Sequence, residues 1–290
     1  MTPDLSPFQL LRERTGIFLD FDGTLSEIVA RPELARPLLD APPLLSRLSR
    51  SFALVAVVSG RQGQDIRRLL GLSGVAVFGM YGLEGHPANV SAVRAAAEEV
   101  FAVSARVRGA WLEDKGASLA VHFRSAPDPD VAGRSIRREL TRIAMRHGLL
   151  VLAGKMVVEL APPETPGKGA VVLRESRARG LAGCVYAGDD RADLAAFAAL
   201  DELRSEGVET LKVAVRSAET PRELVDAANA VVHGPSGLVE LLERLTLDSS
   251  PGPGLGAELE PTGPTGSFAR HAEVPWPGET ARPDPSPDRS

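Results

Sequence analysis

Four short segments of the sequence carry side chains that could together transfer a phosphoryl group. The first is Asp20-Phe21-Asp22-Gly23, which places two carboxylates at the end of an apolar run. The others are Ser59-Gly60-Arg61, Gly167-Lys168-Gly169 and Gly188-Asp189-Asp190, the last followed by Asp193. A carboxylate that attacks an anionic phosphate needs a cation, a lysine and backbone amides nearby to offset the charge repulsion. Together these residue types predict a phosphoryl-transfer site.

Each of these segments, taken alone, has a simpler explanation. Acidic residues after a strand often cap a turn, and a pair of aspartates before a helix is commonly an N-cap. A Ser-Gly-Arg turn and a lysine at a helix start are also common without any function. The run before Asp20 is so apolar, however, that two carboxylates beside it need a metal or another partner. All four segments in this order are more specific than any one of them.

The segments lie where predicted strands end or predicted helices begin. Residues 16–21 and 52–58 are short apolar runs, which are typical of strands buried on both faces of a parallel sheet. Further strands are predicted at 183–187, 211–215 and 230–233, and helices at 64–70, 169–179, 192–200, 221–228 and 236–245. This alternation predicts a doubly wound parallel α/β core, whose carboxyl edge is where such sheets bind ligands.

The middle of the chain follows a different order. Helices are predicted at 89–107 and 130–147, and pairs of strands at 110–114 with 118–124 and at 149–153 with 156–160. The order αββαββ predicts a small antiparallel cap domain, residues 84–165, inserted between two parts of the core, residues 1–83 and 166–247. The last 43 residues, 248–290, hold nine of the 23 prolines and are predicted to be a disordered tail.

Composition limits the classes of function. The 33 basic and 38 acidic residues give a formal charge of -5, so no basic face for nucleic acid is expected. The chain shows neither an apolar run of about 18 residues nor a secretory signal, so no membrane association is expected. Cys184 is the single cysteine, which excludes an intrachain disulfide and fits a reducing compartment. We therefore expect a cytoplasmic protein.

In its four loop motifs the chain resembles the haloacid dehalogenase (HAD) superfamily, over about residues 14 to 247. The resemblance implies that Asp20 is the nucleophile that forms an aspartyl phosphate, and that Asp22 is the general acid and base. It also implies that Ser59, Gly60 and Lys168 bind the transferring phosphoryl group.

The same resemblance implies a Mg²⁺ site. Asp20, the backbone carbonyl of Asp22 and Asp189 would hold the ion, which prefers oxygen ligands and retains several waters. Asp190 and Asp193 would lie behind these ligands and orient Asp189 or the metal-bound waters. Asp193 could equally be an acid on a helix surface.

Within the superfamily the chain resembles the trehalose-6-phosphate phosphatases. The matching cap residues are Glu113, Lys115, Arg124, Lys155 and Glu159. The resemblance implies that both glutamates and Lys115 contact glucose hydroxyls, and that Arg124 and Lys155 help to close the cap on the phosphate side. It also implies a functional link with trehalose-6-phosphate synthase.

The sequence departs from this family at several points and leaves alternatives open. Gly167 replaces an asparagine that commonly precedes the motif lysine, and Tyr81 replaces a common histidine. The substrate could instead be another sugar phosphate, such as sucrose-phosphate or a glycosyl-phosphoglycerate, or the chain could be a non-catalytic regulator of trehalose synthesis. In the cap, His122 could face the site or be structural, and Trp111 could stack on a sugar or pack against a helix.

Overall fold

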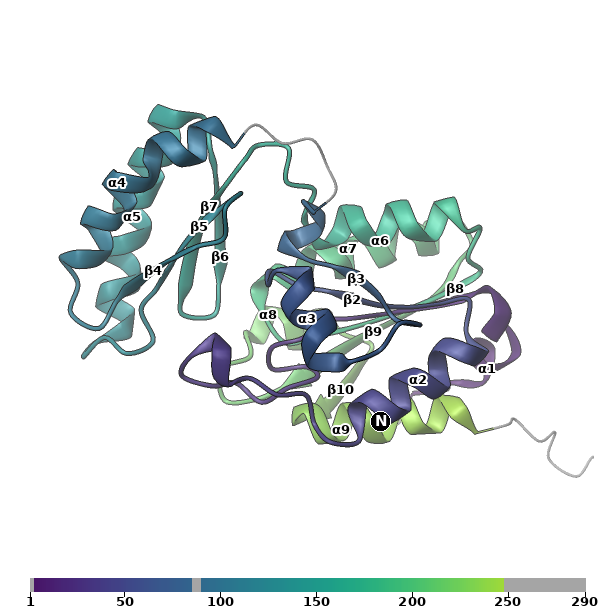
Figure 1. The fold of residues 1–290 in the computed structure, drawn as a ribbon. Coiled ribbons are helices and arrows are strands. Elements are labelled where there is room, and N and C mark those ends of the chain that lie inside the picture. Colours follow the sequence, from purple (N-terminus) through teal and green to yellow (C-terminus); the bar gives the residue numbers. More distant parts are fainter. Residues whose placement is uncertain (1–2, 85–89, 248–290) are drawn as a thin grey trace, which may run out of the picture. The chain divides into compact units, whose positions relative to one another are not determined.

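The structure is a computed structural model that describes residues 3–84 and 90–247 (Figure 1). These residues form a six-stranded sheet in which every pairing is parallel and a four-stranded sheet in which every pairing is antiparallel. The predicted α/β core with an inserted α+β cap is therefore confirmed as a fold class. The tail predicted at 248–290 and residue 89 of the predicted cap helix lie outside the described residues.

The first motif follows β1, one of the two middle strands of the parallel sheet. The strand order is β10-β9-β8-β1-β2-β3, so β1 lies between β8 and β2. The carboxyl ends of these three strands consequently meet at one edge of the sheet. The strands are β1 (Thr15–Leu19), β2 (Leu54–Val58), β3 (Ala76–Phe78), β8 (Gly183–Gly188), β9 (Glu209–Arg216) and β10 (Ala230–His233).

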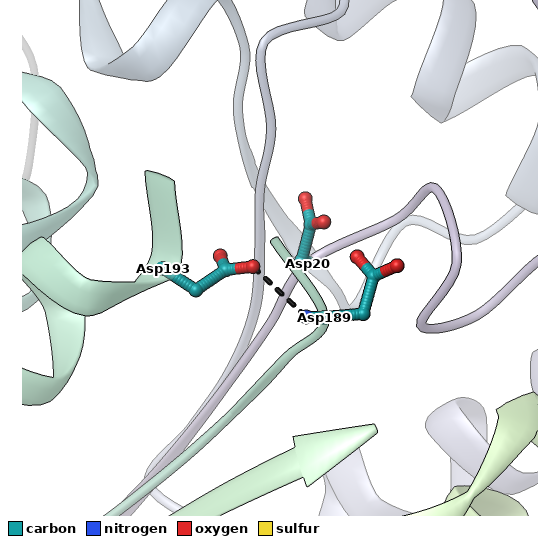
Figure 2. A group of neighbouring side chains, drawn as sticks. All are labelled: Asp20, Asp189 and Asp193. Atoms are coloured by element: carbon teal, nitrogen blue, oxygen red, sulfur yellow. Dashed lines mark hydrogen bonds between the residues drawn. The ribbon is translucent and has the colours of Figure 1, made fainter. Parts of the chain in front are cut away.

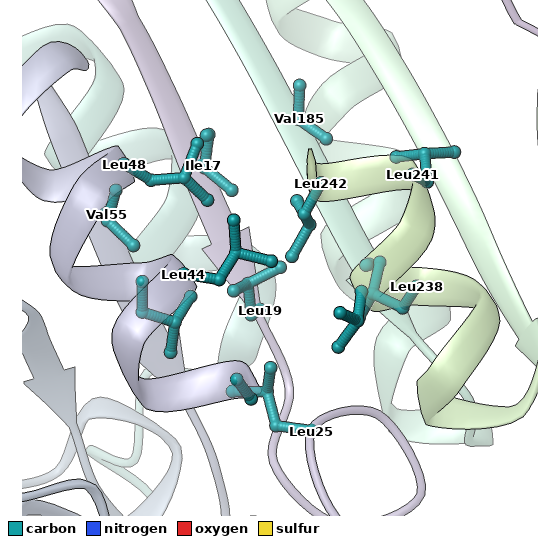
Figure 3. Packing of buried hydrophobic residues seen from close by; sticks show 14 of the residues in the cluster. Ile17, Leu19, Leu25, Leu44, Leu48, Val55, Val185, Leu238, Leu241 and Leu242 are labelled. Atoms are coloured by element: carbon teal, nitrogen blue, oxygen red, sulfur yellow. The ribbon is translucent and has the colours of Figure 1, made fainter. Parts of the chain in front are cut away.

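Helices cover both faces of this sheet because successive side chains of a strand point to opposite sides. Ile17 and Leu19 lie in one hydrophobic cluster, and Phe18 lies in the other. The first cluster, part of which is shown in Figure 3, is completed by α1 (Ser6–Leu10), α2 (Ala41–Ser51), α3 (Gly63–Leu70) and α9 (Gly234–Thr246). The second is completed by α6 (Gly167–Ala178), α7 (Leu194–Ser205) and α8 (Arg222–Ala227).

The antiparallel sheet has a hydrophobic core of its own. Its strands follow the order β4-β5-β7-β6, and the helices α4 and α5 pack together and contribute to this core. The elements are α4 (Ser91–Ala105), β4 (Trp111–Asp114), β5 (Leu119–His122), α5 (Pro129–His147), β6 (Leu150–Gly154) and β7 (Val157–Ala161). We call this set of elements the cap; the domain boundaries at residues 84 and 165 stay predictions. None of the described helices is long and apolar enough to span a membrane.

Candidate active site

Three of the predicted site residues follow directly after three neighbouring strands. Asp20 follows β1, Ser59 follows β2 and Asp189 follows β8. All three are buried, and the backbone N–H of Asp20 donates to the carbonyl of Ala187 in β8 over 2.9 Å. They line a cavity of about 530 Å³ that also contains cap side chains. Strand order therefore brings together segments that are far apart in the sequence.

Lys168 supplies a buried positive charge beside the Asp20 carboxylate. Its Nζ lies 2.8 Å from Oδ1 of Asp20 and 2.7 Å from Oδ1 of Asp193. Burial alone would lower the pKa of Lys168, but the two carboxylates outweigh this and raise that pKa well above its usual value. The ammonium group thus stays charged. The preceding Gly167 has φ +82°, a region that glycine and asparagine tolerate best, which accounts for the exchange of asparagine for glycine here.

Asp193 organises the loop after β8 from behind the cavity. Oδ1 accepts hydrogen bonds from Lys168 and from the hydroxyl of Tyr186 (2.7 Å each), and Oδ2 accepts from the backbone N–H groups of Asp189 and Asp190 (2.9 and 2.8 Å). Figure 2 shows the three aspartates of this site with the bond from Asp193 to the backbone of Asp189. Because both oxygens already accept two donors, Asp193 is better suited to orienting the loop than to binding a metal.

The carboxylates of Asp20 and Asp189 fit a divalent cation. Burial raises the pKa of Asp20 well above its usual value, and burial raises the pKa of Asp189 to about 7 although Lys155 opposes that shift. One oxygen of each, with one of Asp193, lies within 4.8 Å of the others. Within the described residues, Oδ1 of Asp189 is buried and has no hydrogen-bond partner. A cation at this point would satisfy that oxygen and offset the buried negative charge.

Asp22 faces the cavity but points to a residue without a predicted role. Its two oxygens accept hydrogen bonds from Nε and Nη2 of Arg61 at 2.6 and 2.7 Å. Arg61 is part of the Ser-Gly-Arg segment, so its position in the sequence could have identified it. The role in metal binding that the sequence predicts for the backbone carbonyl of Asp22 stays a prediction.

The turn after β3 closes the cavity beside Ser59 and Gly60. Met80 and Tyr81 have φ angles of 50° and 56°, which residues other than glycine rarely adopt. Tyr81 lines the cavity, and a Cβ atom on Gly60 would lie 2.6 Å from its ring. Gly60 therefore allows the tyrosine to approach the loop closely. Such strained backbone is often retained at functional sites.

The cap contributes a buried ion pair to the wall of the cavity. Nζ of Lys115 donates to Oε2 of Glu159 (2.8 Å) and to the carbonyl of Gly60 (2.9 Å), and Ser118 donates to Oε1 of Glu159 (2.5 Å). The side chains of Lys115 and Glu159 are 6% and 3% exposed. Ser118 had no predicted role, although it lies within the strand segment predicted for the cap.

Two further predicted cap residues contact the core. Arg124 donates to both oxygens of Glu219, at 2.6 and 2.9 Å, in the segment that follows β9. Lys155 forms an ion pair with Asp189. Glu219 lies 95 residues from Arg124, and nothing in the surrounding sequence indicates the contact.

The structure places almost all of the predicted residues around one cavity. Its lining includes Asp20, Asp22, Ser59, Gly60, Glu113, Lys115, Arg124, Lys155, Glu159, Lys168, Asp189 and Asp190. Asp193 is the predicted residue that lies outside this lining. The wall also contains residues that were not predicted, among them Val29, Arg36 and Leu69. The functional roles of all these residues stay predictions.

Comparisons with known proteins give the family. The model of the trehalose-phosphatase family matches residues 18–231. A trehalose-phosphate phosphatase of Mycobacterium avium (strain 104) is 34% identical over 251 residues, which are 79% of this chain and 61% of that protein. An uncharacterized glycosyl hydrolase of Mycobacterium tuberculosis is 34% identical over 218 residues, which are 69% of this chain and 16% of that protein. This chain thus spans less than two thirds of these curated relatives.

Solved structures show the same fold. The C-terminal domain of Candida albicans trehalose-6-phosphate phosphatase superposes with a TM-score of 0.70 at 23% identity, covering 85% of this chain and 99% of that one. A trehalose-6-phosphate phosphatase related protein superposes with a TM-score of 0.61 at 25% identity, covering 80% and 96%. Because the family match extends over both the core motifs and the cap, this chain belongs to the trehalose-phosphatase family.

Proposed function

We propose that this protein is a Mg²⁺-dependent phosphatase that hydrolyses trehalose 6-phosphate to trehalose and inorganic phosphate. One observation carries the proposal: Asp20, Lys168 and Asp189 line the same cavity as the cap residues Glu113 and Glu159. A single ligand can therefore present its phosphate to the core residues and its hydroxyl groups to the cap residues.

The core residues support attack by a carboxylate on phosphorus. Lys168 favours the ionised form of Asp20, which its burial opposes. An oxygen of Asp20 bonds to phosphorus while the bond from phosphorus to the sugar oxygen breaks, and Asp22 gives that oxygen a proton. Water then attacks phosphorus in the aspartyl phosphate and loses a proton to Asp22. Inorganic phosphate leaves, and the Asp20 carboxylate is restored.

The proposed ligands of Mg²⁺ are Asp20, the backbone carbonyl of Asp22 and Asp189, whose buried Oδ1 atom is suited to a cation. The bound ion supplies positive charge that reduces the repulsion between the phosphate and the nucleophile. Lys168 contributes a second positive charge beside Asp20, and Ser59 contributes a hydroxyl donor at the end of β2.

A disaccharide phosphate is the substrate class that fits the cap best. Carboxylates accept and ammonium groups donate hydrogen bonds in defined directions, and sugar hydroxyls do both. The relatives named trehalose-phosphate phosphatases, at 34% and 35% identity, support trehalose 6-phosphate as the first candidate. If this is correct, the protein consumes the product of a trehalose-6-phosphate synthase. This is the functional link that we propose.

A panel of sugar phosphates tests the proposal. Phosphate release is measured with trehalose 6-phosphate, sucrose 6-phosphate, a glycosyl-phosphoglycerate and glucose 6-phosphate, each with and without EDTA. We expect the highest kcat/KM with trehalose 6-phosphate, loss of activity with EDTA and recovery with excess Mg²⁺. A rate with trehalose 6-phosphate no better than that with glucose 6-phosphate would contradict the substrate.

The nucleophile is tested separately with Asp20→Asn. We expect this variant to lose at least about 1,000-fold in kcat, because an amide cannot form the acyl phosphate. Asp201→Asn is the matched control, since Asp201 is 59% exposed and pairs with Lys212 away from the cavity. Binding of trehalose 6-phosphate without turnover in the wild type, unchanged by EDTA, would favour a regulator instead.

A further inference from the structure

The first cap hairpin places an aromatic pair beside the wall that the cap contributes to the cavity. Trp111 in β4 is paired with His122 in β5 across the antiparallel ladder. Their rings are stacked with centroids 4.2 Å apart and planes 9° apart. His122 lines the cavity, and its side chain is 16% exposed. The stack therefore holds the imidazole in one orientation at the cavity wall.

Glu113 lies on the same face of this hairpin. It is two residues after Trp111, so strand alternation directs both side chains to the same side. Its cross-strand neighbour is Ala120, whose methyl group leaves room above the sheet. Oε2 of Glu113 lies 2.8 Å from Nε2 of His122, and the Glu113 side chain is 31% exposed. The carboxylate is thus bonded on one side and accessible to a ligand on the other.

The two cap glutamates that line the cavity, Glu113 and Glu159, are held in different ways. Glu159 is bonded to Lys115 and Ser118 and is almost fully buried. Within the described residues, the side-chain hydrogen bond of Glu113 is the one with His122. Glutamate has several rotatable bonds, so its carboxylate needs such a bond to keep one direction. Removing His122 would leave Glu113 without this restraint.

We propose that His122, held by its stack on Trp111, is a positioning residue that directs the Glu113 carboxylate toward the sugar hydroxyls of the substrate. This inference rests on the proposed function, because it assigns a sugar phosphate to the cavity. The restraint makes a carboxylate acceptor available in a fixed direction before the substrate binds. It therefore affects binding of the sugar and leaves the chemistry at Asp20 unchanged.

The first test is His122→Phe, which keeps a flat ring on Trp111 but removes the hydrogen bond. We expect KM for trehalose 6-phosphate to rise about tenfold, within the range for a hydrogen bond to a charged group, with kcat changed less than about threefold. The kcat/KM for p-nitrophenyl phosphate, which carries no sugar, should stay within about twofold. His147→Phe is the matched control, because His147 makes the same 2.8 Å contact with Glu99 and does not line the cavity.

A double-mutant cycle with Glu113→Gln shows whether His122 acts through Glu113. If it does, adding His122→Phe to Glu113→Gln raises KM by less than about twofold beyond Glu113→Gln alone. If the two effects multiply, His122 acts independently and the inference is wrong. His122→Gln keeps an N–H donor for Glu113 but loses the ring that stacks on Trp111, so it should raise KM about as much as His122→Phe does.

Two variants of Trp111 test the stack itself, and the activity of the wild type separates a failure of this inference from a failure of the proposed function. Trp111→Phe keeps a ring for the stack and is expected to leave KM within about threefold, whereas Trp111→Ala should raise KM about as much as His122→Phe does. If His122→Phe does not fold, this pair of tryptophan variants decides the question. Wild-type protein that hydrolyses p-nitrophenyl phosphate but not trehalose 6-phosphate would overturn the proposed function. A wild type active on trehalose 6-phosphate with an unchanged KM in folded His122→Phe would overturn this inference alone.

Discussion

The guanidinium of Arg61 donates two hydrogen bonds to the carboxylate of Asp22, from Nε to Oδ2 over 2.6 Å and from Nη2 to Oδ1 over 2.7 Å. The arginine is itself held firmly. Its Nη1 donates to the carbonyl of Pro32 over 2.9 Å, and its guanidinium carbon lies 5.4 Å from the centre of the Phe21 ring. Planar two-point pairs of this kind fix direction as well as charge. Arg61 thus restrains the residue that we propose as the general acid and base.

Replacing Arg61 is expected to slow catalysis more than it weakens binding. In Arg61→Met the Asp22 side chain loses its restraint, and we expect kcat to fall roughly 10- to 100-fold with KM within about threefold, as for a misplaced catalytic group. Steady-state kinetics with the preferred sugar phosphate measures both values. Arg67→Met is the control, since Arg67 is 54% exposed and pairs with Glu84. A large rise in KM with constant kcat would show that Arg61 binds substrate instead.

Asp193 is expected to stabilise the folded protein. It accepts four hydrogen bonds and is fully buried, and an asparagine amide would turn two N–H groups toward donors. For Asp193→Asn we expect a loss of about 3 kcal/mol in the free energy of unfolding, because Lys168 loses a buried partner. Urea denaturation measures this change, with Asp201→Asn expected to stay within about 0.5 kcal/mol of wild type. An unchanged urea midpoint for Asp193→Asn would contradict the role in loop organisation.

The core could be predicted because its strands are buried on both faces. The five residues of β1 and the five of β2 are all buried, and such continuous apolar runs are visible in a sequence. The charged residues at their ends then locate the site, since parallel strands share one carboxyl edge. The edge strand β3 was not predicted, because its three half-buried residues give no distinctive pattern. Tyr81, which follows it, was noted as a departure from the family but given no role.

The contacts between side chains could not be predicted in the same way. The bond between His122 and Glu113 depends on the register of a hairpin, and the stack on Trp111 depends on which residues face each other across it. Local sequence offered two possibilities for each ring and could not decide between them. The pairing of Arg124 with Glu219 depends on how two distant segments pack. Sequence spacing indicates which residues reach a site, whereas tertiary packing determines their partners.

Gly23 is expected to be essential because the Asp189 carboxylate occupies the space of its missing side chain. A Cβ atom on Gly23 would lie 1.9 Å from Oδ2 of Asp189, and the residue has φ +79°. Gly23→Ala should therefore lose about 1–2 kcal/mol from its backbone conformation and also displace the carboxylate. We expect this variant to lose activity by roughly 100-fold or more, and to lose the rise in Tm that Mg²⁺ gives the wild type.

Gly207→Ala is the control that separates the backbone cost of Gly23→Ala from the displacement of the Asp189 carboxylate. Gly207 has φ +89°, and within the described residues no heavy atom beyond its chain neighbours lies within 4 Å of an added Cβ. It should share the backbone cost of about 1–2 kcal/mol but keep full activity and the response of Tm to Mg²⁺. Equal activity in the two variants would contradict the close approach of Gly23 to Asp189.

Cys184 is expected to be unreactive in the folded protein. Burial in β8 raises the pKa of its thiol to about 11, although Ser176, 3.2 Å away, opposes this shift. Because the folded pKa lies above the unfolded one, the neutral thiol adds stability below about pH 9 that is lost as the pH rises through 11. Between pH 9 and pH 11 we expect the free energy of unfolding of the wild type, relative to that of Cys184→Ala, to fall by roughly 2 kcal/mol in urea denaturation.

Thiol labelling tests the burial of Cys184 directly. Iodoacetamide at pH 8 should label the native protein at least about 100-fold more slowly than the urea-unfolded chain. Rapid native labelling would show that the thiol is exposed and that β8 is packed differently.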